Sequence, residues 1–189
     1  MPNANTPFGA RPLYNTNGTS YTGNSLLCAI PASDGAATFL GDFVKLGGSS
    51  DATTGVPTVV QAAATEALYG VIVSFEPLRT NLELNYRAAS TLRYCYVCVD
   101  KGVMYEMQED SVGNNIDANM VGLAVDIVVG AGNTVTGVSA MQIDSSDTAT
   151  AAGQVRLMGL VRREDNAVGT NAKWLVVINE SQLAVTTDF

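Results

Sequence analysis

The sequence contains no histidine, and this absence removes several kinds of chemistry at once. Ser-His-Asp and Cys-His nucleophile systems both use an imidazole as the general base, and histidine is also the commonest metal ligand. The three cysteines are too few to complete a four-ligand structural zinc site without histidine. We therefore predict a protein that is not an enzyme and that has no catalytic residue, metal site or cofactor.

Carboxylate chemistry does not need histidine, because a glycosidase uses only two suitably spaced acids. The acids that could form such a pair are Glu66, Glu76, Glu83, Glu106 and Glu109. Most of them fall on alternating strand positions or in turns, where solvated carboxylates are usual. A hydrolase stays open as an alternative, and it predicts two carboxyl groups about 5 to 10 Å apart in a groove.

Charged residues are scarce, at 15% of the chain against about 25% in an average soluble protein. The 18 acidic and 10 basic residues leave a net charge of -8. A negative protein repels phosphate backbones and has few cations with which to release their counterions. We expect no direct binding to nucleic acid.

No secretion signal or membrane-spanning segment is recognisable in the sequence. Residues 1–10 have neither a basic nor a long apolar region, and the apolar stretch Met120–Gly130 is interrupted by Asp126. Three cysteines are an odd number and too few for a disulfide framework, which favours synthesis in a reducing compartment. We expect a soluble protein without membrane contact.

Cys95 and Cys98 form a C-x-x-C pair within a segment that is otherwise typical of a strand. In an extended chain, residues three apart point to opposite faces, so the two thiols would not converge. Free cysteine also packs well as a small apolar side chain. The pair is therefore interpreted as core packing and not as a redox or metal site.

A two-residue alternation of apolar side chains recurs along the chain. It is clearest in Leu68–Phe75, where alternate residues from Tyr69 onward are large and apolar. Further strands are expected at residues 26–32, 39–46, 57–63, 92–99, 103–108, 138–143, 154–162 and 174–179. Asp100–Gly102 joins two of these strands and predicts a hairpin. In residues 116–129, Asp117 is expected to cap one helical turn that precedes a strand.

About ten short strands separated by turns are typical of a β-sandwich or barrel. No segment has a sustained 3.6-residue apolar period, so helices are expected to be minor. No internal repeat and no break in composition divides the chain after residue 25. The sequence predicts an all-β body over residues 26–189, a sandwich or barrel of the jelly-roll-like kind.

Residues 1–25 are predicted to form an extended N-terminal arm. Pro2, Pro7 and Pro12 disfavour both a helix and a central strand. The large apolar residues of this segment are Phe8, Leu13, Tyr14 and Tyr21, and its charged residue is Arg11. A free, solvated segment has little reason to carry so many large apolar groups. A disordered terminus is the alternative.

Two segments resemble parts of known virion proteins. Residues 5–12, Asn-Thr-Pro-Phe-Gly-Ala-Arg-Pro, are similar to the opening of many tailed-phage virion proteins. The run from Leu160 to Glu180, which includes Arg162, Arg163 and Trp174, resembles the closing segment of phage capsid cement, or decoration, proteins. The middle of the chain is similar to that family mainly in its succession of strands and turns.

The resemblance implies a β-sandwich or jelly-roll-like body on the outer surface of an HK97-fold capsid, with arms that reach over neighbouring subunits. The partners would be the major capsid protein and other copies of this chain, as a homotrimer, and the protein would be made in the cytoplasm of the bacterial host. Interface candidates are Phe8, Arg11, Leu13, Tyr14, Tyr21, Arg162, Arg163 and Trp174. The alternative is a receptor- or glycan-binding β-domain of a phage tail or fibre, which predicts an exposed cleft lined by aromatic side chains.

Overall fold

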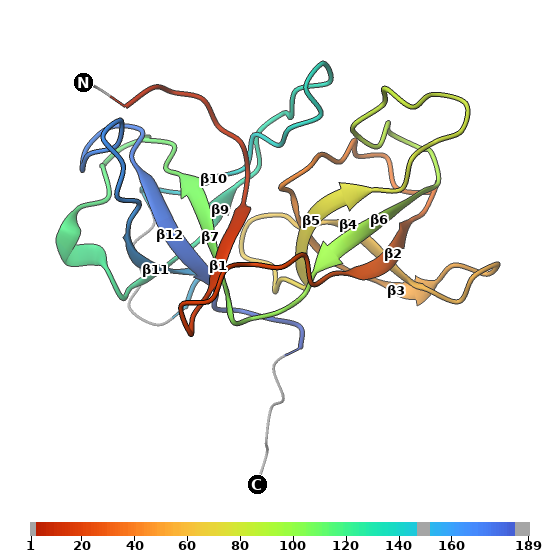
Figure 1. Cartoon of the computed structure of the whole chain (residues 1–189), viewed down its shortest axis with the longest axis horizontal. Coiled ribbons are helices and arrows are strands. Elements are labelled where there is room, and N and C mark those ends of the chain that lie inside the picture. Colours follow the sequence, from red (N-terminus) through yellow and green to blue (C-terminus); the bar gives the residue numbers. More distant parts are fainter. Residues whose placement is uncertain (1–2, 147–151, 184–189) are drawn as a thin grey trace, which may run out of the picture.

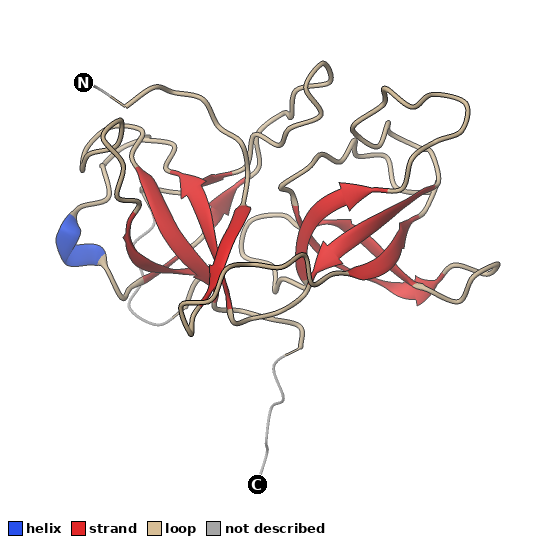
Figure 2. Ribbon diagram, in the orientation of Figure 1, coloured by secondary structure: helices blue, strands red, loops and turns tan. Residues whose placement is uncertain are grey.

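A computed structural model describes residues 3–146 and 152–183. The prediction of an all-β protein is confirmed, because the regular structure of the described residues is nearly all strand (Figure 2). The elements are β1 (Arg11–Asn15), β2 (Leu26–Ile30), β3 (Phe43–Ser50), β4 (Pro57–Gln61), β5 (Gly70–Phe75), β6 (Arg93–Cys98), β7 (Val103–Gln108), the 3-10 turn η1 (Ala118–Met120), β8 (Ala124–Val125), β9 (Ile127–Val128), β10 (Gln142–Ile143), β11 (Val155–Leu160) and β12 (Lys173–Ile178). Pro2 and the last residues of the predicted body, 184–189, lie outside the described residues.

The strands form two neighbouring units, which lie side by side in Figure 1. On the right, β2-β4-β3-β5-β6 closes into a barrel, so none of these strands is left with a free edge. The barrel has its own apolar core, formed by Cys28, Ile30, Val44, Val59, Tyr69, Ile72, Cys95 and Val97. Tyr69 and Ile72 belong to this core, whereas Val71 belongs to a second apolar cluster, so the strict alternation predicted from Tyr69 onward is not kept.

The second unit is an antiparallel sheet of order β1-β7-β12-β11-β8, accompanied by the short pair β9–β10. Its strands come from both ends of the chain, because β1 pairs with β7 and β7 pairs with β12. One face of this sheet is buried and carries Val103, Tyr105, Met107, Val155, Leu157, Trp174, Val176 and Ile178. Residues between these positions point to the opposite, outward face.

A shared core joins the two units. Phe43, Leu68 and Val71 of the barrel belong to the same apolar cluster as the buried face of the sheet. The rings of Phe43 and Tyr105 meet edge to face with their centroids 6.1 Å apart. Packing across the junction therefore stabilises the barrel and the sheet together.

The predicted hairpin at Asp100–Gly102 is wrong. The turn forms, with the Asp100 carboxylate accepting a hydrogen bond from the Gly102 amide, but β6 and β7 do not pair. β6 lies between β2 and β5 in the barrel, whereas β7 lies between β1 and β12 in the sheet. A local turn signal specifies the reversal of the chain and says nothing about which strands supply the cross-strand partners.

Other local predictions are confirmed. Asp117 caps η1, and its carboxylate accepts a hydrogen bond from the Asn119 amide at 2.7 Å. Cys95 lies in the barrel core and Cys98 in the shared core, on opposite faces of β6 as the alternation predicts. The strand expected at 138–143 is reduced to β10, Gln142–Ile143.

Jelly-roll connectivity and an N-terminal arm are not confirmed. In the described part of the N-terminal segment, the Asn3 amide group donates hydrogen bonds to the carbonyls of Ala167 and Thr170. The Gln108 side chain bonds the backbone of Ala4 and Thr6. Residues from Arg11 onward then form an edge strand of the sheet.

A buried arginine organises the loops at one end of the barrel. Arg87 is 0% exposed and donates hydrogen bonds to the carbonyls of Pro31, Asp34, Ala36 and Thr91. Its guanidinium also lies 3.6 Å from the Asp34 carboxylate. A planar group with five donors can satisfy several buried carbonyls at once, which an ammonium cannot do.

Asp42 is a buried carboxyl directly before β3. It is 1% exposed, and its Oδ2 accepts hydrogen bonds from the Phe39 amide and from the Gln61 side chain, each at 2.9 Å. Burial raises the pKa of Asp42, and these hydrogen bonds oppose the shift without cancelling it. Burial also raises the pKa of Glu109.

These raised pKa values predict a pH dependence of stability. The folded state takes up the Asp42 proton at a higher pH than the unfolded state does. The contribution of Asp42 to the free energy of unfolding therefore increases as the pH falls from neutral and decreases as the pH rises. The variant Asp42→Asn should therefore show a smaller rise in the free energy of unfolding as the pH falls from neutral towards the ordinary pKa of an aspartate, as measured by urea denaturation.

The matched control is Asp51→Asn. Hydrogen bonds from Thr54 lower the pKa of Asp51. The contribution of Asp51 to stability is therefore present at a pH above the ordinary pKa of an aspartate and is lost as the pH falls. This variant should change the acid end of the profile in the opposite direction. A profile for Asp42→Asn that is parallel to the wild-type profile would contradict the assignment.

Candidate functional site

The outward face of the five-stranded sheet is unusually apolar. The exposed face of an antiparallel sheet ordinarily carries polar side chains. Here the outward positions include the large apolar residues Tyr14, Met104, Leu175 and Val177, and Met158 in a β-bulge beside them is 43% exposed. Contiguous apolar surface of this kind is typical of a contact with another molecule.

The sequence of strand β12 also indicates that both of its faces are covered. Trp174–Ile178 is a continuous apolar run, which is the pattern of a strand that is covered on both faces. In the structure one face packs into the shared core, while Leu175 and Val177 on the other face are only half-buried. The second cover is therefore not provided by the described part of the chain.

A groove crosses this outward face, and we call it the sheet groove. Its volume is about 410 Å³, and its lining consists of Leu13, Tyr14, Glu106, Leu160, Val161, Arg162, Arg163 and Leu175. Gly159 is the register partner of Leu175, and a Cβ added at Gly159 would meet no atom within 4 Å. The absence of a side chain at this position leaves the face open beside Leu175.

A buried carboxylate forms the polar part of the sheet groove. The Glu106 side chain is 1% exposed, and its Oε1 lies 2.7 Å from Nη2 of Arg163. Arg11 approaches the other carboxylate oxygen at 4.0 Å, and Nε of Arg163 lies 3.2 Å from Asp165. Because a buried charge needs a partner, Glu106 holds the Arg163 guanidinium over the groove.

The same region collects the positive charge of an acidic protein. Five of the ten basic residues lie on or beside this face, namely Arg11, Arg156, Arg162, Arg163 and Lys173. The acidic residues among them are Glu106, Glu164 and Asp165. The rest of the chain has five basic and fifteen acidic residues, so the sign of the local charge is reversed here. A partner that brings carboxylates would be favoured.

The structure brings together half of the interface candidates that the sequence predicts. Leu13, Tyr14, Arg162 and Arg163 line the sheet groove, although about 150 positions separate the two segments. The pairing of β1 with β7 and of β7 with β12 is the reason, since it places both ends of the chain in one sheet.

The remaining candidates are not part of the lining of the sheet groove. Phe8, Arg11 and Tyr21 line a neighbouring cavity of about 320 Å³ at the junction of barrel and sheet, where the Arg11 guanidinium lies 4.6 Å from the centroid of the Phe8 ring. We call it the junction hollow. Trp174 is 0% exposed and belongs to the shared core, so its side chain has no surface to offer to a partner.

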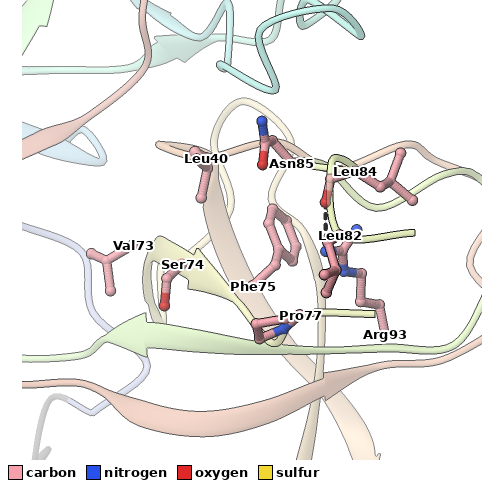
Figure 3. Close-up of a pocket in the computed structure, with 9 residues that line it drawn as sticks. All are labelled: Leu40, Val73, Ser74, Phe75, Pro77, Leu82, Leu84, Asn85 and Arg93. Carbon is pink, nitrogen blue, oxygen red and sulfur yellow. Dashed lines mark hydrogen bonds between the residues drawn. The ribbon is translucent and has the colours of Figure 1, made fainter. Parts of the chain in front are cut away.

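A third hollow lies beside the loop that joins β5 to β6, and Figure 3 shows its lining. Its volume is about 210 Å³. Arg93 donates a hydrogen bond to the Leu84 carbonyl at 2.7 Å and lies 5.0 Å from the centroid of the Phe75 ring, which fixes the loop over the barrel. At the rim, Leu82 is 74% exposed.

Four further groove residues are not evident from the sequence: Glu106, Leu160, Val161 and Leu175. The continuous apolar run of β12 is the signal that could have revealed Leu175. No comparable signal exists for Glu106, because its neighbours in the groove come from strands that are distant in the sequence.

Chemistry in the sheet groove is limited by its lining. The described residues lining it include one carboxylate, Glu106, which is paired with Arg163, whereas a two-carboxylate hydrolase needs a second one in the same groove. Within residues 3–146 and 152–183, no group of three or more His, Cys, Asp or Glu side chains is placed to hold a metal ion. Over the same ranges, no helix has the length and apolar character needed to cross a bilayer.

Comparison of the chain with protein-family models, with curated proteins and with solved structures found no match.

Proposed function

We propose that this protein is a structural virion protein that binds the outer surface of a phage capsid and cements neighbouring major capsid subunits. The observation that carries the proposal is the outward face of the five-stranded sheet, which is apolar and basic on an otherwise acidic protein. Surfaces of this kind are typical of protein–protein contacts. The segment Leu160–Glu180, which resembles phage cement proteins, supplies five residues of the sheet groove.

In this proposal the capsid presents an acidic, partly apolar surface to the sheet groove. Arg162 is exposed at the groove and would bind carboxylates of the capsid, while apolar side chains of the capsid would cover Leu13, Tyr14 and Leu175. Arg163 would contribute less, because Glu106 and Asp165 already bind it. The basic face also orients the acidic remainder of the protein away from the acidic capsid surface.

We infer further that residues 1–25 act as an arm on the capsid and that the body is jelly-roll-like. The arm would stay on the body through the Asn3 side chain and through β1, while Phe8 and Tyr21 meet the neighbouring subunit. Association as a homotrimer would multiply these contacts. A typical interface buries about 800 Å² per partner, and bridging several subunits makes the later contacts intramolecular.

The proposal predicts that Arg162→Glu weakens capsid binding. Purified protein would be mixed with expanded phage capsids that lack it, followed by co-sedimentation and by measurement of the temperature at which the shell is disrupted. Wild-type protein should bind and raise that temperature. We expect Arg162→Glu to weaken binding at least about tenfold, since a favourable charge pair becomes a like-charge contact.

The matched control is Arg79→Glu, which makes the same change of charge at an exposed position in the loop between β5 and β6. This variant should bind like the wild type. Equal loss of binding in both variants would assign the effect to net charge, and full binding by Arg162→Glu would remove the sheet groove from the proposal.

A receptor- or glycan-binding domain of a phage tail or fibre is the second candidate. The junction hollow favours it, because Phe8 and Tyr21 provide two aromatic side chains beside the cation Arg11. A glycan array tests this candidate: reproducible binding that is lost in Phe8→Ala, together with failure to bind capsids, would replace the capsid proposal.

A further inference from the structure

Cys28 and Cys95 lie directly opposite each other in the barrel. They are register partners in the antiparallel pair formed by β2 and β6, and both are 0% exposed within the barrel core. Opposite residues of an antiparallel pair have Cα atoms about 4.5 or 5.5 Å apart, according to the hydrogen-bonding position. A disulfide requires a Cα separation of about 4.4 to 6.8 Å, so both kinds of position satisfy it.

We propose that Cys28 and Cys95 form a latent cross-strand disulfide site, which closes when the protein meets an oxidising environment. In the sequence, the closely spaced pair is a different one, Cys95 and Cys98. Tertiary structure places these two on opposite faces of β6 and brings Cys28, which is distant in the sequence, beside Cys95. The proposal does not depend on the capsid function.

Cys98 is excluded from the reaction by its position. It faces the shared core, where the Tyr105 hydroxyl donates a hydrogen bond to its Sγ at 3.2 Å. Its register partner is Val71, which offers no thiol. The structure therefore predicts one specific bond among the three that three cysteines allow.

The reaction is a two-electron oxidation. Each thiol gives up one proton, the two sulfur atoms together give up two electrons, and one S–S bond forms while the oxidant is reduced. With diamide as the oxidant, the two electrons and two protons convert its N=N bond to the hydrazine. Thiol–disulfide chemistry proceeds through the thiolate.

Burial should make this reaction slow in the native state. It raises the pKa of Cys28 to about 11 and raises the pKa of Cys95 as well, so few thiolates exist at neutral pH. The same burial would protect the finished bond from reductants. The protein would then remain reduced where it is synthesised and become cross-linked only after long exposure to an oxidising environment.

The bond should stabilise the barrel by linking strands whose cysteines are far apart in the sequence. A cross-link across a long loop reduces the entropy of the unfolded chain. For a protein of this size, we expect the midpoint of thermal unfolding to rise by about 5 to 15 °C.

The test uses the full chain in two parallel treatments. Folded protein would be incubated with diamide at pH 8.5, and separately the reduced, unfolded protein would be refolded in an oxidising glutathione buffer. Thiols would then be alkylated under denaturing conditions and counted by mass spectrometry, with mapping of any linked peptides. We expect one remaining thiol, at Cys98, and a Cys28–Cys95 peptide pair after at least the refolding treatment.

Variants separate the specific bond from other oxidation. Cys98→Ala should form the same bond and show the same rise in midpoint, whereas Cys28→Ala and Cys95→Ala should show neither. Three free thiols after both treatments would overturn the proposal. A bond between Cys95 and Cys98, or a cross-link between molecules, would overturn it equally.

Discussion

Replacing Trp174 by alanine should lower the free energy of unfolding by about 3 to 5 kcal/mol, the range for removal of a fully buried aromatic side chain. Trp174 is 0% exposed and packs in the shared core, on the face of β12 opposite the sheet groove. The surrounding core side chains come from strands of both units, so the cavity cannot collapse without disturbing the junction. Urea denaturation followed by far-UV circular dichroism would measure the loss.

Leu82→Ala is the control for this change. Leu82 is 74% exposed, so its truncation should alter the free energy of unfolding by less than about 0.5 kcal/mol. The loss in free energy of unfolding for Trp174→Phe should fall between those for Trp174→Ala and Leu82→Ala, because phenylalanine keeps an aromatic ring of smaller volume. The comparison also tests the role of Trp174 predicted from the sequence: normal stability with lost capsid binding would make it an interface residue in spite of its burial.

Replacing Arg87 by methionine should destabilise the protein by a similar amount, about 3 to 5 kcal/mol. The change removes the donors to four backbone carbonyls and the cation beside the Asp34 carboxylate. Methionine fills much of the volume of the arginine side chain. The loss of stability would therefore come mainly from the carbonyls and the carboxylate that are left without a donor. Lysine should not restore stability, because one ammonium cannot reach all the carbonyls that lie around the edge of the guanidinium.

Two measurements would identify the cause of this effect. Urea denaturation should show the destabilisation in Arg87→Met and almost none in Arg79→Met, where the arginine is exposed. Limited proteolysis of Arg87→Met should show new cleavage in residues 31–36 and 87–91, the segments that the guanidinium joins. Unchanged stability would mean that water replaces the guanidinium at these carbonyls.

Destabilising changes must be separated from changes that affect binding. Trp174 and Arg87 are buried and are expected to act on folding, whereas Arg162 is exposed and is expected to act only on the capsid contact. Arg163 is a poorer choice for the binding experiment, since its removal would leave the buried Glu106 carboxylate without its closest partner. A loss of capsid binding in Arg162→Glu with an unchanged midpoint of unfolding would therefore be specific.

The sequence by itself determined the local structure of this protein. Two-residue alternation predicted strands near their observed positions, as in β5, because side chains of an extended chain must alternate between faces. The same alternation predicted that Cys95 and Cys98 lie on opposite faces. The position of Asp117 before a short helical turn predicted its role as a cap. The absence of histidine and the acidic charge restricted the chemistry without any knowledge of the fold.

Only the tertiary structure decided which strands meet. The turn at Asp100–Gly102 separates a barrel from a sheet, although locally it is typical of a hairpin. The sheet groove, the four carbonyls around Arg87 and the pairing of Cys28 with Cys95 all depend on contacts between distant segments. The physical reason is that backbone propensity acts over a few residues, whereas strand order is set by the burial of apolar faces contributed by the whole chain.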